Sequence, residues 1–217
     1  MTVVKVCDVR SVEIARSCAD IGVDLLGLHC IWESPSDDRL EMLEAVACAV
    51  AGRCKVVLVT RQTDVGKVVA MTRRIAWDYV QLHARWEPVQ VAALRAELAR
   101  RGARPQVIGV VEASPSDIGR IEALEESVDL LLFDSTLRGG SGMGSSLSAL
   151  GDAISHVRSK PFLIAGGLRI ENVVRHLKRF RPWGVDVQSG VEKADGSREK
   201  DLELIRRFTE TVRAWKD

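Results

Sequence analysis

Apolar and polar residues follow one another along this chain in two alternating patterns. Short runs rich in valine, isoleucine and leucine predict β-strands that are buried on both faces. Stretches with apolar residues at positions i, i+3 and i+4 predict amphipathic helices. A helical stretch follows each strand candidate, so the chain reads as a series of strand–helix units. The strand candidates span residues 3–7, 24–30, 54–60, 78–83, 106–112, 129–134, 161–165 and 184–189.

Local signals mark several of the expected helix ends. Ser11 and Asp64 stand where an N-cap residue is expected, and Gly22 and Gly102 follow the last turns of two helices. No proline-rich linker, low-complexity tract or change of composition separates the units. The sequence therefore predicts a single domain over residues 1–217.

The number of units favours one fold class. Eight strand–helix units in 217 residues predict a closed (β/α)8 TIM barrel, in which reactive groups lie at the C-terminal ends of the strands. A doubly wound open sheet is the alternative. That fold usually carries a glycine fingerprint after its first strand, whereas this chain has "CDVRS" there.

Composition and charge narrow the possible partners. Hydrophobic residues make up 46% of the chain and charged residues 28%, which is typical of a globular protein. A net charge of +1 gives no electrostatic reason to expect nucleic acid or a membrane as partner. We find no apolar run of about 20 residues and no signal-peptide pattern. The five cysteines form no CxxC pair, so we expect reduced thiols and a cytoplasmic protein. Nothing in the sequence specifies an oligomeric state.

Glycine-rich segments follow the last three strand candidates. They read "RGGSGMGSS", "AGGL" and "QSGVE". In barrels of this class, loops after the seventh and eighth strands frequently bind phosphate through backbone N–H groups, and glycine lets these groups approach the anion closely. The sequence therefore predicts a barrel of the phosphate-binding type.

The chain resembles the phosphoribosylanthranilate isomerase family of tryptophan biosynthesis over nearly its full length. The resemblance rests on the motifs "VKVCDV", "GVDLLGL", "VQLHA", "LLLFDS…GGSGMG", "IAGGLRIENV" and "VDVQSGVE". It implies an aldose–ketose isomerase that needs neither cofactor nor metal. The implied reaction is an Amadori rearrangement, in which an N-glycoside of ribose 5-phosphate becomes a 1-amino-1-deoxyribulose 5-phosphate.

The resemblance also implies roles for individual residues. Cys7 occupies the general-base position and Asp134 the general-acid position, while His83 and Asp186 match further residues of the family's site. The implied phosphate-binding residues are Gly140, Ser141, Gly142, Gly166, Gly167, Ser189 and Gly190.

The proposed chemistry places opposite demands on the two catalytic groups. The carboxyl group of Asp134 must be protonated to act as an acid, and the preceding apolar run "LLLF" would raise its pKa. The thiol of Cys7 must lose its proton, so its pKa must be lowered. Lys5 lies two residues earlier on the same strand face and is expected to stabilise the thiolate. We further expect Asp186 to pair with Lys5.

The segment after the second strand departs from the family's pattern. It reads "IWESPSDDRLEML", and the arginine that the family uses for the anthranilate carboxylate is replaced by Ser36. Asp37 and Asp38 follow and would repel a carboxylate, whereas Arg39 could bind it if the loop is shifted. Asp8 and Arg10 likewise replace a glycine and a threonine. We therefore expect a substrate that carries anthranilate or a related aromatic or heterocyclic amine.

Two other functions are compatible with the sequence. A metal-dependent phosphopentose epimerase could use His29, His83, Asp134 and Asp186 as ligands. A phosphate-binding barrel without turnover is the non-enzymatic alternative. The presence of both Cys7 and Asp134 favours the isomerase.

Overall fold

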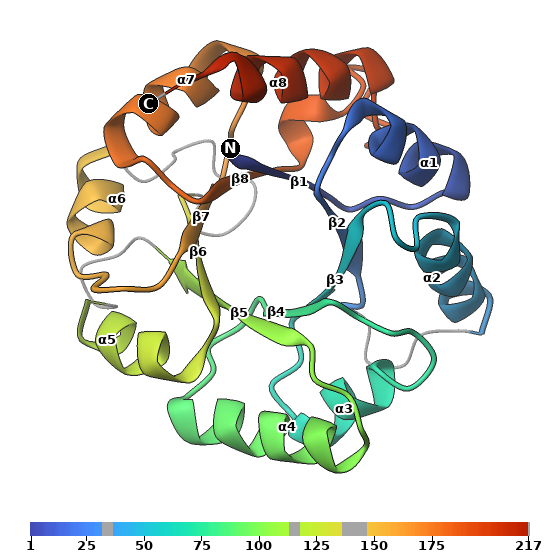
Figure 1. The fold of residues 1–217 in the computed structure, drawn as a ribbon, viewed down its shortest axis with the longest axis vertical. Coiled ribbons are helices and arrows are strands. Elements are labelled where there is room, and N and C mark those ends of the chain that lie inside the picture. The colour runs from blue at the N-terminus through green and yellow to red at the C-terminus, as the bar shows by residue number, and fades with distance from the viewer. Residues whose placement is uncertain (32–36, 113–117, 136–146, 217) are drawn as a thin grey trace.

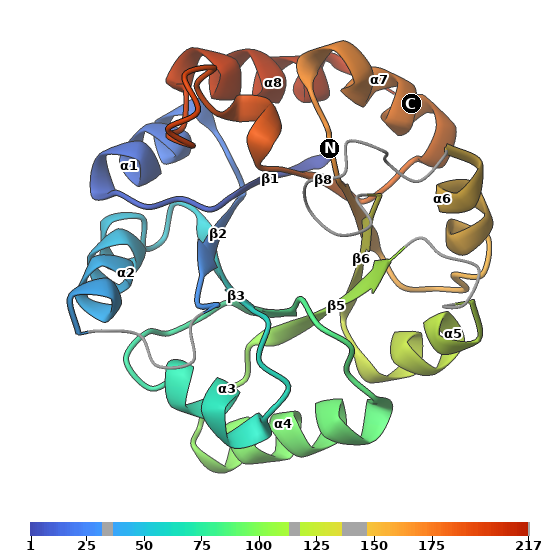
Figure 2. The same ribbon diagram turned by 180° about the vertical axis from the view of Figure 1, so that it is seen from behind.

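The computed structural model describes residues 1–31, 37–112, 118–135 and 147–216. It confirms the predicted fold class, because eight parallel strands form a closed barrel in the order β1 to β8 and the helices surround it (Figures 1 and 2). The strands are β1 Val3–Cys7, β2 Leu25–His29, β3 Lys55–Thr60, β4 Tyr79–Leu82, β5 Gln106–Glu112, β6 Leu130–Asp134, β7 Phe162–Ala165 and β8 Gly184–Val187. The helices are α1 Val12–Ile21, α2 Asp37–Ala49, α3 Val65–Met71, α4 Pro88–Arg100, α5 Ile118–Ser127, α6 Leu147–Ile154, α7 Ile170–Phe180 and α8 Leu202–Ala214, with a 3₁₀ turn, η2, at Ser189–Val191.

Apolar side chains pack on both sides of the barrel wall. Those that point outward join the helices in one continuous core. Those that point inward fill the barrel, which explains why the strands are apolar at successive positions. The described part of the chain contains no helix that is long and apolar enough to cross a membrane. The inner cluster consists of Cys7, Leu25, Val57, Val59, Ile108, Val110, Leu130, Leu132, Leu163 and Ala165.

The helix ends predicted from local signals are confirmed. The Ser11 side chain accepts a hydrogen bond of 3.2 Å from the N–H of Ile14 at the start of α1. Asp64 accepts one of 2.8 Å from the N–H of Lys67 at the start of α3. Gly22 ends α1 with a φ of 90°, a conformation that disfavours residues with a side chain.

Three aspartates fix the register of the strands at the N-terminal face of the barrel. Asp24, Asp78 and Asp129 stand just before β2, β4 and β6. Each accepts a hydrogen bond from a backbone N–H of the preceding strand, at 2.7 Å from Val4, 2.9 Å from Val56 and 2.7 Å from Val107. Because each carboxylate joins two neighbouring strands, the pairs β1–β2, β3–β4 and β5–β6 are each held at their starts.

The last helix fastens the two ends of the chain together. Arg213 of α8 donates hydrogen bonds to the backbone carbonyls of Thr2 and Gly22 and pairs with Asp24 at 2.6 Å. The N-terminal strand β1 lies beside β8 (Figure 1). Closure of the barrel therefore joins its first and last strands, and α8 covers the seam.

The eighth strand is shorter than the sequence predicts. The expected strand covered 184–189, whereas β8 ends at Val187 and Ser189 begins η2. The chain turns here because Gly190 packs against the backbone carbonyl of Leu168, where a side chain has no space. The buried ammonium of Lys200 donates to the carbonyl of Gln188 at 3.0 Å and holds this turn.

A buried carboxylate links α5 to the turn before β7. Glu125 accepts hydrogen bonds from the backbone N–H groups of Arg158, Ser159 and Lys160, at 3.1, 2.6 and 2.8 Å. Burial raises the pKa of Glu125, but these hydrogen bonds outweigh that effect and hold the pKa below its usual value.

We therefore expect the Glu125→Ala substitution to reduce the free energy of unfolding by about 2–3 kcal/mol at pH 7, since three backbone donors lose a charged acceptor. A depressed pKa stabilises the fold above the unfolded-state pKa of about 4.3, and that contribution is lost as the pH falls through the folded-state value. Urea unfolding at pH 7 and pH 3 would measure it. A difference of equal size at both values would contradict the assignment.

Candidate active site

The polar residues predicted from the strand ends come together at the C-terminal face of the barrel. Lys5 and Cys7 both point inward from β1, and Lys5 lies in register with Asp186 of β8. The Lys5 Nζ is 2.8 Å from Asp186 Oδ2, and both side chains are buried. The expected pairing of these two residues is confirmed. Asp186 Oδ1 has no hydrogen-bond partner among the described residues and can accept a hydrogen bond from a ligand.

The thiol of Cys7 is more difficult to ionise than the sequence suggests. Burial raises its pKa to about 11, although the Lys5 ammonium opposes this through its charge and a hydrogen bond. For Lys5, burial lowers the pKa, but the charges of Asp186 and Cys7 outweigh it, so the net pKa is raised. Lys5 therefore stays an ammonium. The expectation of a lowered thiol pKa is wrong for this structure, because desolvation of the thiolate exceeds the stabilisation that Lys5 provides.

A glycine on the second strand makes room for both groups. A Cβ atom at Gly27 would lie 2.8 Å from Cys7 Sγ and 3.1 Å from Lys5 Nζ. The first distance is too short for a carbon atom and the second is tight, so any larger residue would displace the thiol. Gly27 thus allows the sulfur and the cation to lie beside one another over β2.

The thiol also contacts a histidine at the end of β2. Cys7 Sγ is 3.3 Å from His29 Nε2, and His29 Nδ1 is 3.4 Å from Asp8 Oδ1. Asp8 in turn accepts two hydrogen bonds from the guanidinium of Arg10, one of them 2.9 Å long. Burial lowers the pKa of His29 to about 4, although the charge of Asp8 opposes this. The imidazole is therefore neutral at pH 7.

A second histidine stands beside the predicted acid. His83 Nε2 is 4.0 Å from Asp134 Oδ2, and the Gln81 amide nitrogen lies 3.3 Å from His83 Nδ1. Burial lowers the pKa of His83, and the charge of Asp134 opposes that shift. When Gln81 donates to Nδ1, the ring proton of the neutral imidazole lies on Nε2 and faces Asp134. His83 is thus placed to contact the carboxyl group of Asp134.

Two of the three glycine-rich segments lie around this cluster. Gly166 and Gly167, after β7, have φ values of 89° and 67°, which turn the backbone sharply away from the strand. A Cβ atom at Gly166 would lie 2.6 Å from Asp134 Oδ1. Ser135 Oγ donates to the Gly166 carbonyl at 2.7 Å and ties the ends of β6 and β7 together. Ser189 and Gly190 lie in η2, after β8.

The contacts described above do not test the roles of the remaining predicted residues. Gly140, Ser141 and Gly142 lie outside the described residues, as does Ser36. Arg39 lies in the first turn of α2 with an exposed side chain. Their roles stay predictions.

The described residues contain no group of three or more histidine, cysteine, aspartate or glutamate side chains that could hold a metal ion. His29, His83, Asp134 and Asp186 come from four different strands and do not form such a group. The epimerase alternative therefore lacks a set of metal ligands in the part of the chain that the structure describes.

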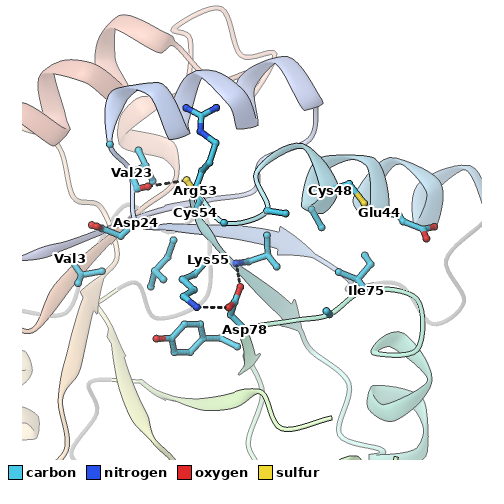
Figure 3. Close-up of a pocket in the computed structure, with 18 of the residues that line it drawn as sticks. Val3, Val23, Asp24, Glu44, Cys48, Arg53, Cys54, Lys55, Ile75 and Asp78 are labelled. Carbon is cyan, nitrogen blue, oxygen red and sulfur yellow. Dashed lines mark hydrogen bonds and ion pairs between the residues drawn. The ribbon is translucent and has the colours of Figure 1, made fainter. Parts of the chain in front are cut away.

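A hollow of about 780 Å³ lies at the opposite, N-terminal face, lined by the starts of β1 to β4 (Figure 3). Its charged residues are already paired: Lys55 binds Asp78 at 2.8 Å, and Arg74 binds Glu44 at 2.8 Å. The thiol of Cys54 donates to the Val23 carbonyl (Figure 3). In (β/α)8 barrels this face contributes to stability, whereas chemistry takes place at the other face. We therefore place the candidate active site at the C-terminal face.

Sequence reasoning overlooked several residues of the site. The sequence indicated His29 only as a possible metal ligand and not as a contact of Cys7, and it indicated Asp8 and Arg10 only as departures from a family pattern. Gln81 was not considered, although its spacing of two residues from His83 places both on the inner face of the barrel. This two-residue spacing is the feature of the sequence from which Gln81 could have been identified.

A closed (β/α)8 barrel with polar side chains and glycine turns at its C-terminal strand ends has the architecture of a barrel enzyme. The sequence profile of the N-(5'phosphoribosyl)anthranilate (PRA) isomerase family matches residues 4–211. The chain belongs to this family.

Individual relatives agree with that assignment. The N-(5'-phosphoribosyl)anthranilate isomerase of Rhodopseudomonas palustris (strain BisA53) is 33% identical over 217 residues, covering 97% of this chain and 95% of that protein. The enzyme of the same name from Azorhizobium caulinodans is 34% identical, with 97% and 91% covered. The crystal structure of phosphoribosyl anthranilate isomerase from Thermotoga maritima superposes with a TM-score of 0.81 at 23% identity, covering 99% and 100% of the two chains, which shows the shared fold.

We expect the Lys5→Met substitution to slow alkylation of Cys7 by iodoacetamide at pH 8 by at least about tenfold, because one unit of pKa corresponds to a tenfold change in thiolate. The rate would be followed by peptide mass spectrometry. The same substitution leaves the Asp186 charge buried and should cost about 3–5 kcal/mol of stability. The double variant Lys5→Met/Asp186→Asn should regain much of that stability but not the reactivity. An unchanged alkylation rate in a folded variant would remove Lys5 from this role.

Proposed function

We propose that this protein is an isomerase that catalyses the Amadori rearrangement of an N-(5-phosphoribosyl) amine to the 1-amino-1-deoxyribulose 5-phosphate. The amine is anthranilate or a related aromatic or heterocyclic amine. The observation that carries the proposal is the arrangement of Cys7 and Asp134 at the rim of one barrel, on β1 and β6, each beside its own histidine. The family to which the chain belongs supports the same reaction.

The reaction needs an acid and a base that act on different atoms of the sugar. Asp134 gives its proton to the furanose ring oxygen, the ring opens, and a protonated Schiff base forms at C1. Cys7 then takes the proton from C2, and the electron pair of that C–H bond forms the C1=C2 double bond of an enolamine. Tautomerisation moves a proton to C1 and yields the ketone. The cycle closes when Cys7 releases the proton that it took from C2 and Asp134 takes up a proton from solvent.

The charges around Cys7 suit the second step. The Lys5 ammonium lies beside the sulfur and stabilises negative charge on it before it takes up the C2 proton. Asp186 holds that ammonium through Oδ2, while Oδ1 remains without a partner among the described residues. We assign Oδ1 to a hydroxyl group of the substrate, because a buried carboxylate oxygen needs a donor.

The phosphate group would be held at the ends of β7 and β8. The positive φ values of Gly166 and Gly167 direct the chain so that backbone N–H groups are available, and Ser189 adds a hydroxyl group. The proposal extends this site to Gly140, Ser141 and Gly142. Arg39 is assigned to the acidic group of the amine, as a replacement for the arginine that Ser36 displaces.

The test is turnover of phosphoribosylanthranilate, followed by loss of its fluorescence. We expect the wild-type protein to convert it and the Cys7→Ser and Asp134→Asn variants to be slower by about 10²–10⁴-fold, the usual contribution of a general acid or base. Cys48→Ser is the matched control, because Cys48 is an exposed thiol on α2, and it should keep the wild-type rate.

Two results would contradict parts of the proposal. Wild-type turnover by either site variant would refute the assigned acid and base. Tight binding of the substrate by the wild-type protein without turnover would favour the binding barrel over the isomerase. Conversion of other phosphoribosyl amines but not of the anthranilate compound would instead identify the altered loop as the determinant of specificity.

A further inference from the structure

Four side chains at the ends of β1 and β2 form a continuous polar chain that starts at the thiol of Cys7. His29 Nε2 lies 3.3 Å from Cys7 Sγ, and Asp8 Oδ1 lies 3.4 Å from His29 Nδ1. Arg10 holds both oxygens of Asp8 from the solvent side. The thiol, the imidazole and the carboxylate thus follow one another as in other enzymes, where an imidazole oriented by a carboxylate activates a nucleophile or a base.

The backbone at Asp8 makes this arrangement unexpected on local grounds. Asp8 has a φ of 63°, in the left-handed region that glycine adopts most readily. Its side chain is also buried, with 4% of its surface exposed. A charged residue in an unfavourable conformation and a buried position indicates that the side chain serves a purpose beyond the turn itself.

The contacts define which groups can receive a proton from Cys7. Lys5 is an ammonium and has no lone pair to offer. Asp8 Oδ1 lies 3.4 Å from His29 Nδ1, so the carboxylate favours the ring proton on Nδ1 and leaves the lone pair of Nε2 facing the sulfur. Among the residues that the structure describes, the imidazole of His29 is the basic group within hydrogen-bonding distance of this thiol. The side chain is 19% exposed, so it can exchange protons with water.

We propose that His29 is a further catalytic residue, which accepts the thiol proton of Cys7 as the thiol removes the proton from C2, and that Asp8, held by Arg10, is a positioning residue that fixes the tautomer of His29. The inference rests on the proposed isomerase function. The S–H bond breaks while an N–H bond forms at Nε2, and the sulfur gains the C2 proton. The imidazolium then releases its proton to water, which balances the proton that Asp134 takes up.

This relay removes the need for a thiolate before the substrate proton arrives, while the low pKa of His29 makes the imidazolium short-lived. A free thiolate beside Lys5 would have to form in advance if Cys7 acted alone. With His29 in contact, the proton leaves the sulfur only as the substrate proton arrives, and the charge that develops on the imidazole lies next to the Asp8 carboxylate.

The first test reads the thiol itself and does not depend on the substrate. We expect His29→Asn to slow alkylation of Cys7 by iodoacetamide between pH 6 and 8 by at least about tenfold, because the thiol loses its proton acceptor. His156→Asn is the matched control, since it makes the same substitution outside the site, and it should leave the rate unchanged. An unchanged rate in a folded His29→Asn variant would overturn the proposal even if the protein is an active isomerase.

The second test separates positioning by Asp8 from a merely structural role. We expect Asp8→Gly to keep the melting temperature, because glycine fits the positive φ, but to lower kcat by about tenfold or more with KM little changed. The acidic limb of the pH profile of kcat should also shift, since the carboxylate sets the basicity of His29. Equal kcat values and pH profiles for Asp8→Gly and the wild type would overturn the role of Asp8. If the wild-type protein does not convert the anthranilate substrate, the alkylation result still decides whether His29 takes the thiol proton.

Discussion

The ion pair between Lys5 and Asp186 is the interaction on which the interior of this protein depends. It lies inside the barrel with both side chains buried, and its two residues belong to the first and last strands. A buried ion pair seldom adds net stability, but removal of one partner leaves an uncompensated charge. The pair therefore specifies how the barrel closes, and it places a cation directly beneath Cys7.

Each of the two proposed catalytic side chains, Cys7 and Asp134, has a histidine beside it. The thiol of Cys7 contacts His29, and the carboxyl group of Asp134 lies near His83. In each case the far nitrogen of the imidazole meets a polar side chain, Asp8 on one side and Gln81 on the other. Burial keeps both imidazoles neutral. In the resting site, neutral rings therefore add no further positive charge next to Lys5.

The fold could be predicted from the sequence, because the spacing of apolar residues that marks a strand or a helix is contained within each short segment. Valine- and leucine-rich runs marked every strand to within one or two residues, and Ser11 and Asp64 cap the helices as expected. The early end of β8 could not be predicted, because it depends on the approach of Leu168, after the neighbouring strand β7, to Gly190. The candidate site was predicted by position, but the raised pKa of Cys7 and the contact with His29 depend on burial and on distances between strands. The aspartates that fix the strand starts were visible as residues preceding apolar runs, yet their partners lie on other strands.

The seam between β1 and β8 has a consequence for synthesis of the chain. Lys5 and Asp186 are 181 residues apart in the sequence, and Arg213 fastens Thr2 only after α8 has formed. A nascent chain emerging from the ribosome therefore carries β1 with an unpaired edge, and Lys5 without its carboxylate partner, until β8 has been synthesised. Long exposure of such an edge favours association with other chains. Assembly of the barrel thus waits for the synthesis of β8, which gives β1 its second neighbour.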